Sequence, residues 1–113
     1  MLALLEKTNR VNILYDFYGS LLTRRQQQII ELYYQHNLSL GEIAEEYQIS
    51  RQAVYDLMNR AVKALERFED KLELYKKYQV QRDKYHKLFS YLESNERIER
   101  EKIKSILTEL WEL

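Results

Sequence analysis

The chain has 113 residues, a length that suits one domain, or one small domain with an appended arm. Its formal net charge is zero, and 45% of its residues are apolar against 32% charged, which is typical of a folded protein and excludes wholesale disorder. The absence of cysteine excludes disulfides, thiolate nucleophiles and cysteine-ligated zinc. With no proline and only two glycines, the composition predicts an all-α fold.

The N-terminal stretch MLALLEKTNR does not resemble a signal peptide. It has no leading positive region, no long apolar segment and no small-residue cleavage site. No window of the sequence reaches the roughly 18 apolar residues that a membrane span needs. We therefore expect a cytoplasmic protein without a membrane span.

Two helices are predicted before the central motif. Apolar residues at helical spacing over residues 4–18 indicate the first helix, which Gly19 is expected to end in a left-handed conformation. Thr23 followed by Gln26 forms a capping box, which predicts the start of a second helix. Asn37 can end this helix because asparagine tolerates left-handed geometry.

The stretch SLGEIAEEYQISRQAVYDLMNRA predicts a helix-turn-helix motif. Ser39 and Glu42 form a capping box for a short helix, and Ser50 is the expected N-cap of the recognition helix. Ala44 is the small residue that lets the two helices cross closely. Gln48 stands where glycine is most common, which predicts a less strained connection. A small core is expected from Ile43, Ile49, Val54 and Leu57.

The recognition helix would present a polar face to nucleic acid. Arginine and glutamine are suited to guanine and adenine edges, respectively. The candidate nucleic-acid contacts on this helix are Arg51, Gln52, Tyr55, Asn59, Arg60 and Lys63. Residues 39–70 carry seven acidic against four basic groups, however, and an acidic motif forfeits the phosphate contacts that dominate nonspecific affinity. The alternative is an ordinary solvated face.

A basic segment at residues 71–87 follows the motif, with six basic against two acidic residues. Tyr78 and Tyr85 are interleaved with basic residues there, a pattern that can bind RNA by charge and stacking. The alternative is a solvated helix whose aromatic residues pack on a partner. The candidate nucleic-acid contacts in this segment are Lys76, Lys77, Arg82, Lys84 and Lys87.

No helix breaker occurs from Arg51 to Ser94, which predicts one long helix with a kink, a break or solvent exposure around residues 79–84. Its first part carries apolar residues at heptad spacing, which indicates a homodimer interface. The alternative is that residues 88–113 fold back and cover this seam. A turn is expected at Ser94-Asn95, and residues 96–112 predict a last helix. The expected interface consists of Val54, Met58, Ala61, Leu65, Phe68, Leu72 and Tyr75, with Trp111 of the last helix.

No pattern of catalytic or metal-ligating residues is found in the sequence. His36 and His86 lie far apart, and neither belongs to a ligand motif. There is no Ser/His/Asp arrangement and no glycine-rich phosphate loop. We therefore expect a protein that is not an enzyme and that has neither a metal nor a cofactor.

The stretch LLTRRQQQIIELYYQHNLSLGEIAEEYQISRQAVYDLMNRAVKALE resembles the last DNA-binding region of bacterial sigma factors. With EKTNRVNILYDFYGSLLT before it, the chain is similar over residues 5–87 to the YlxM family of small bacterial proteins. YDFYGSLLT, SLGEIAEEY and SRQAVYD carry that match. The resemblance implies a sigma-like helical domain without a polymerase-core-binding region. It also implies an association with the signal recognition particle pathway, through the particle's RNA or its GTPases.

Together these features predict an all-α, sigma-factor-like helix-turn-helix bundle, extended by a long helix and a C-terminal helix. The helix-turn-helix domain is expected at residues 1–70, and residues 71–113 are expected to form the extension and to dimerise. The first functional hypothesis is a non-catalytic regulator that binds DNA or structured RNA. The second is a protein-interaction module that modulates a secretion GTPase or the transcription machinery.

Overall fold

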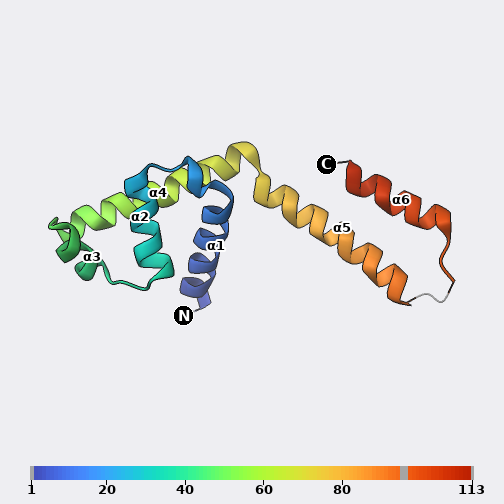
Figure 1. The fold of residues 1–113 in the computed structure, drawn as a ribbon, viewed down its shortest axis with the longest axis horizontal. Coiled ribbons are helices and arrows are strands. Elements are labelled where there is room, and N and C mark those ends of the chain that lie inside the picture. The colour runs from blue at the N-terminus through green and yellow to red at the C-terminus, as the bar shows by residue number, and fades with distance from the viewer. Residues whose placement is uncertain (1, 95–96, 113) are drawn as a thin grey trace. The chain divides into compact units, whose positions relative to one another are not determined.

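The computed structural model describes residues 2–94 and 97–112 of the chain. Six α-helices and no strand are found in these residues, which confirms the predicted all-α fold (Figure 1). None of the helices in the described ranges has the length and apolar character to cross a bilayer. The chain forms two compact units, Met1–Glu73 and Leu74–Leu113.

The first unit contains four α-helices and two short helical turns. Three predicted caps are confirmed here: the hydroxyls of Thr23, Ser39 and Ser50 each accept a hydrogen bond from a backbone N–H three residues on, at 3.2, 3.1 and 3.0 Å. The elements are α1 (Leu2–Tyr18), a 3₁₀ turn (Gly19–Leu21), α2 (Arg24–Ile30), a π-helical turn (Glu31–Gln35), α3 (Leu40–Tyr47) and α4 (Arg51–Leu72).

Gly19 ends α1 differently from the sequence expectation. Neither glycine has a positive φ, so the predicted left-handed stop is wrong. A Cβ atom at Gly19 would lie 3.0 Å from the ring of Tyr15. Glycine therefore allows the Tyr15 ring to pack closely against the backbone at this position. Asn37 does adopt the expected left-handed conformation, with φ 59°.

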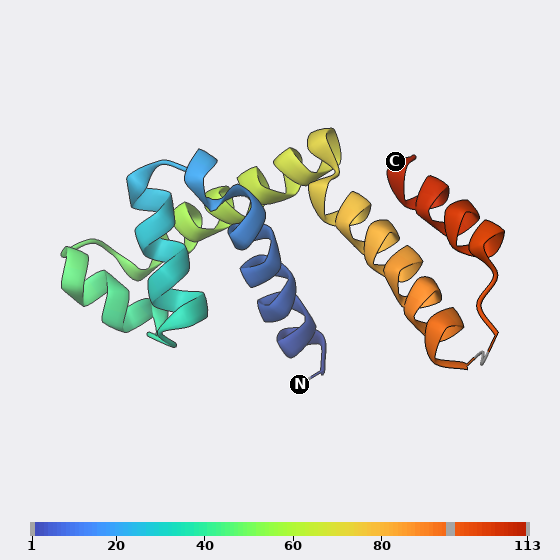
Figure 2. The same cartoon turned by 45° about the vertical axis from the view of Figure 1, so that its right-hand side comes forward.

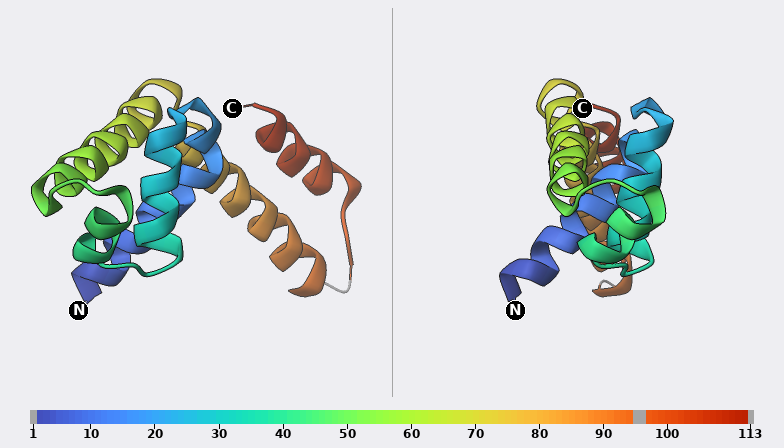
Figure 3. Two further views of the ribbon diagram at one scale, coloured as in Figure 1. Left: turned by 60° about the vertical axis from the view of Figure 1, so that its left-hand side comes forward. Right: turned by 90° about the vertical axis from the view of Figure 1, so that its left-hand side faces the viewer.

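The core of the first unit forms where α1, α2 and α3 pack against α4 (Figures 1 and 3). Burying each large apolar side chain contributes about 1.5–3 kcal/mol relative to exposure. The long apolar stripe of α4 is therefore covered by helices of its own chain. Its fully buried members are Val54, Ala61 and Leu65, and they share the core with Leu14, Ile29 and Ile43.

The predicted single long helix is wrong, because α4 ends at Leu72 and α5 begins at Leu74. Glu73 joins them in a left-handed conformation, with φ 53° and ψ 33°. Of the alternatives expected at residues 79–84, the structure shows solvent exposure: α5 runs unbroken through them, and Gln79 and Arg82 are exposed. The break lies close to where the buried stripe of α4 ends, and glutamate at this position gives no sequence signal for a left-handed residue.

The second unit is an antiparallel hairpin of α5 (Leu74–Ser94) and α6 (Arg100–Trp111), seen side by side in Figure 2. The predicted last helix begins later than expected, at Arg100. The turn expected at Ser94-Asn95 falls partly outside the described residues. Within the described part of this unit, only Ile106 and Leu110 are buried.

Gln48 closes the turn between α3 and α4 in a left-handed conformation, with φ 55° and ψ 45°. The less strained connection expected from its side chain is therefore wrong. Left-handed geometry costs an L-residue about 1–2 kcal/mol, and glycine avoids this cost.

We predict that Gln48→Gly raises the free energy of unfolding by about 0.5–1 kcal/mol, because part of that gain is offset by the entropy of glycine in the unfolded chain. Urea denaturation followed by circular dichroism measures the change. Gln48→Ala is the matched control, because it keeps the Cβ atom and should bring no gain. Equal stabilisation by both variants would contradict the account of the turn.

Candidate nucleic-acid interface

The two helices of the motif are held by a small buried contact between α3 and α4. Ile43 and Val54 are fully buried, and Ala44 is buried where the helices approach each other. The Ile49 N–H donates to the Ala44 carbonyl oxygen at 3.1 Å, which fixes the chain as it leaves α3. The Ser50 cap then sets the first residue of α4. The outward side of α4 is positioned by this arrangement.

The polar face of α4 lies opposite its buried stripe, because residues one turn apart share a face. Five of the six candidate contacts are exposed and Asn59 is partly exposed. The structure therefore brings together six side chains from the first four turns of one helix: Arg51, Gln52, Tyr55, Asn59, Arg60 and Lys63.

Asp56 is the acidic residue within this polar face. The Gln52 side-chain nitrogen Nε2 donates to its carboxylate oxygen Oδ1 at 3.1 Å. The glutamine amide is thus already engaged, and the carboxylate places a negative charge among three cations, Arg51, Arg60 and Lys63. A phosphate approaching this face meets both attraction and repulsion.

The carboxylates of two other acidic residues of α4 accept hydrogen bonds from side chains of α1. Arg10 donates to Glu66 through Nε at 2.7 Å and Nη2 at 2.8 Å, a bidentate pair. The Tyr18 hydroxyl donates to Glu69 at 2.6 Å, and both of these residues are buried. These carboxylates serve the α1–α4 contact. The acidic count over residues 39–70 thus overstates the negative charge that nucleic acid would meet.

A hollow of about 110 Å³ lies beside the polar face of α4 and brings Lys7 of α1 next to Tyr55 and Asn59. Sequence reasoning did not identify Lys7, since no local pattern links positions so far apart. The hollow is lined by Leu4, Lys7, Tyr33, Tyr34, Leu40, Tyr55, Met58, Asn59 and Val62.

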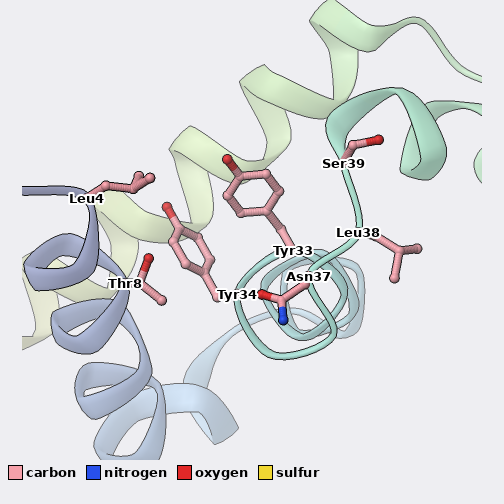
Figure 4. A pocket seen from close by; sticks show the side chains of 7 residues that line it. All are labelled: Leu4, Thr8, Tyr33, Tyr34, Asn37, Leu38 and Ser39. Carbon is pink, nitrogen blue, oxygen red and sulfur yellow. The ribbon is translucent and has the colours of Figure 1, made fainter. Parts of the chain in front are cut away.

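Two neighbouring hollows share residues with this one. One, of about 290 Å³, lies between the start of α1 and the segment that follows α2, where Figure 4 shows Tyr33 and Tyr34 beside Leu4 and Thr8. Burial raises the pKa of Tyr34, with a smaller effect from Tyr33, so its phenol stays neutral at physiological pH. The other hollow, of about 300 Å³, is lined by Leu40, Arg51, Gln52 and Tyr55.

The basic segment of residues 71–87 is partly used inside the second unit. The Lys84 ammonium donates to the Glu112 carbonyl oxygen at 3.0 Å and also to that of Glu109, where it caps the C-terminus of α6. Lys87 forms an ion pair with the Glu109 carboxylate at 3.6 Å. The remaining candidates of this segment, Lys76, Lys77 and Arg82, are exposed.

The seam proposed for dimerisation divides into core and surface positions. Val54, Met58, Ala61 and Leu65 are buried within the first unit, so they are core residues and not a free seam. The fold-back alternative is also wrong for them, because α1, α2 and α3 cover this part of α4. The other positions, Phe68, Leu72, Tyr75 and Trp111, keep partial or full exposure.

The fold and the α3–α4 motif define a helix-turn-helix protein. The chain belongs to the UPF0122 family, whose description is "Putative helix-turn-helix protein, YlxM / p13 like" and which matches residues 5–106. The predicted family is confirmed, and the match extends beyond residue 87 into α6.

Several relatives are similar over most of their length. UPF0122 protein YlxM of Bacillus subtilis (strain 168) is 55% identical over 84 residues, which cover 74% of this chain and 76% of that protein. A UPF0122 protein of Listeria monocytogenes serotype 4b (strain CLIP80459) is 54% identical over 89 residues, or 79% and 77% of the two chains. A UPF0122 protein of Anoxybacillus flavithermus (strain DSM 21510 / WK1) is 47% identical over 104 residues, or 92% and 94%.

The buried pair of Tyr18 and Glu69 anchors α1 on α4. We predict that Tyr18→Phe lowers the free energy of unfolding by about 1.5–3 kcal/mol, because a buried carboxylate loses a hydrogen bond. Chemical denaturation measures this loss. Tyr15→Phe is the comparison, since its hydroxyl donates to the less buried Glu31 and its removal should cost less. A Tyr18→Phe variant as stable as the unaltered chain would contradict the anchor.

Proposed function

We propose that this chain is a non-catalytic regulator that binds nucleic acid with the polar face of α4. The observation that supports this most directly is that five candidate contacts are exposed, and a sixth partly exposed, on the helix that follows the turn of the motif. The major groove of B-form DNA admits an α-helix, and arginine and asparagine can bind base edges there. Arg60 directly follows Asn59, and Lys63 lies about one turn beyond it; both would contact phosphates.

Duplex DNA suits this surface better than duplex RNA. The major groove of an A-form helix is too narrow for side chains on a helix to read. Structured RNA would therefore be bound mainly through its phosphates, by the cations of α4. Lys76, Lys77 and Arg82 of α5 are exposed and offer phosphate contacts of their own. RNA of the signal recognition particle is the RNA to test, and this choice comes from the family resemblance.

The test is a fluorescence-anisotropy titration of the full chain with duplex DNA and with the particle's RNA at several salt concentrations. We predict that Arg60→Glu with Lys63→Glu weakens binding at least about tenfold and flattens its salt dependence, because two phosphate contacts become repulsive.

The matched control is Arg97→Glu with Lys102→Glu, which changes the net charge equally at exposed positions of the second unit. Equal loss in both double variants would show that only net charge matters. Binding that neither pair alters would remove the α4 face from the proposed interface.

Asp56 provides a second test of the same face. We predict that Asp56→Asn raises affinity for duplex DNA about three- to tenfold, because it removes a negative charge and keeps an oxygen that can accept from Gln52. The control is Asp70→Asn, the same change on the same helix roughly 20 Å away. The anisotropy titration measures both, and a larger gain from Asp70→Asn would place the interface elsewhere on α4.

The second candidate function is a protein-interaction module that modulates a secretion GTPase or the transcription machinery. It is favoured by Glu45 and Glu46, two exposed acidic residues on α3. A nucleic acid would be repelled there, whereas a basic protein surface would be attracted. This function predicts no salt-dependent binding of nucleic acid and an altered rate of GTP hydrolysis when the chain is added to the particle's GTPases. Glu45→Lys with Glu46→Lys should cancel that alteration.

A further inference from the structure

The α5–α6 hairpin has a narrow line of contact between its two helices. On α5, Lys84 and Tyr91 make this contact: the lysine caps α6, and the Tyr91 hydroxyl accepts from the Glu99 N–H at 2.9 Å. Partly buried Leu88 lies between them at helical spacing. On α6 it passes through the two buried residues, Ile106 and Leu110. Each series advances by three or four residues, as expected for one face of a helix.

In both helices, each residue of the contact line is followed in the sequence by a large apolar residue. They are Tyr85, Phe89 and Leu92 on α5, and Leu107 and Trp111 on α6. One residue is a rotation of about 100° around a helix axis. Because the helices are antiparallel, the same rotation turns both sets toward the same side of the hairpin. We call these five residues the hairpin apolar face.

The hairpin apolar face is strongly exposed, while the opposite side of the hairpin is polar. Lys87 and Glu109 form their ion pair on that opposite side, beside Asp83 and Ser90. The exposed fractions on the apolar face are 49% for Tyr85, 59% for Phe89, 37% for Leu92, 50% for Leu107 and 89% for Trp111. A surface hollow of about 440 Å³ around Leu107 and Trp111 continues it.

The hairpin buries too little by itself to account for two regular helices. A domain of fewer than about 40 residues usually needs disulfides, a bound metal or oligomerisation in order to fold. The sequence has no cysteine, and no cluster of metal-ligating side chains occurs among the described residues. Of the three usual supports, association is therefore the one to which the described residues of the hairpin point.

We propose that the hairpin apolar face is a homodimer interface that receives the same face of a second copy, so that two hairpins form a four-helix bundle. A buried aromatic side chain removes roughly 150–250 Å² from water, so the exposed parts of the five residues amount to on the order of 500 Å² per copy. Two copies would bury on the order of 1,000 Å², the area at which specific interfaces begin.

A second copy also fits this face chemically. The five residues carry no charge, so a twofold axis brings no like charges together at the centre, and the polar sides of both hairpins remain in water. Helix pairs that each present one apolar side commonly close into four-helix bundles. This interface differs from the seam expected from the sequence, whose first half is core. It is also independent of the proposed binding of nucleic acid.

Trp111 allows the proposal to be tested in the full chain, because it is the single tryptophan. Sedimentation equilibrium should give a dimer at micromolar concentration. On dilution, the emission of Trp111 should move to longer wavelength and its quenching by acrylamide should rise. Both changes should have the same midpoint concentration as the dissociation of the dimer. A chain that stays monomeric at tens of micromolar would overturn the proposal. A dimer whose Trp111 remains as exposed as in the monomer would overturn it as well.

Substitutions then locate the interface. Phe89→Glu and, on the other helix, Leu107→Lys should each raise the dissociation constant of the dimer at least about hundredfold, because each buries an unpaired charge. Ser90→Glu is the matched control for the first, since it adds the same charge one position away on the polar side and should leave the dimer intact. Equal effects of Phe89→Glu and Ser90→Glu would overturn the assignment of this face. So would dimers that survive both Phe89→Glu and Leu107→Lys.

Discussion

The structure of the first unit depends on the burial of one side of α4. Val54, Ala61 and Leu65 are withdrawn from water by three helices that precede α4 in the chain. This requirement fixes where α3 crosses α4, and the Ser50 cap fixes where α4 starts. The direction of the polar face follows, because a helix that buries one side must present the other to solvent.

The same contact decides which charges are available for binding. Glu66 and Glu69 are held by Arg10 and Tyr18 of α1, so two carboxylates that look unfavourable for nucleic acid in the sequence have a structural role. In the second unit, a lysine expected to bind nucleic acid caps α6 instead. Packing thus engages candidate charges of both signs, and the charges left exposed are fewer than the sequence suggests.

The features that sequence reasoning predicted well are local ones. Thr23, Ser39 and Ser50 each bond to a backbone group three residues away, so a short motif contains all the information. No local pattern predicts the geometry of Gln48 and Glu73, which adopt left-handed conformations without being glycine or asparagine. At Gln48 the packing of α3 against α4 outweighs a local cost of about 1–2 kcal/mol. At Glu73 the break between α4 and α5 has no local sequence signal.

By itself, the sequence determined the all-α class, the caps, the helix-turn-helix motif and the family, because each depends on residues that are close together in the chain or on similarity along it. Only the tertiary structure decided which stripe of α4 is core, where the long helix breaks, and that Lys7 lies beside Tyr55 and Asn59. These outcomes depend on contacts between residues some 50 positions apart, such as the pair of Tyr18 and Glu69, and no short pattern encodes them.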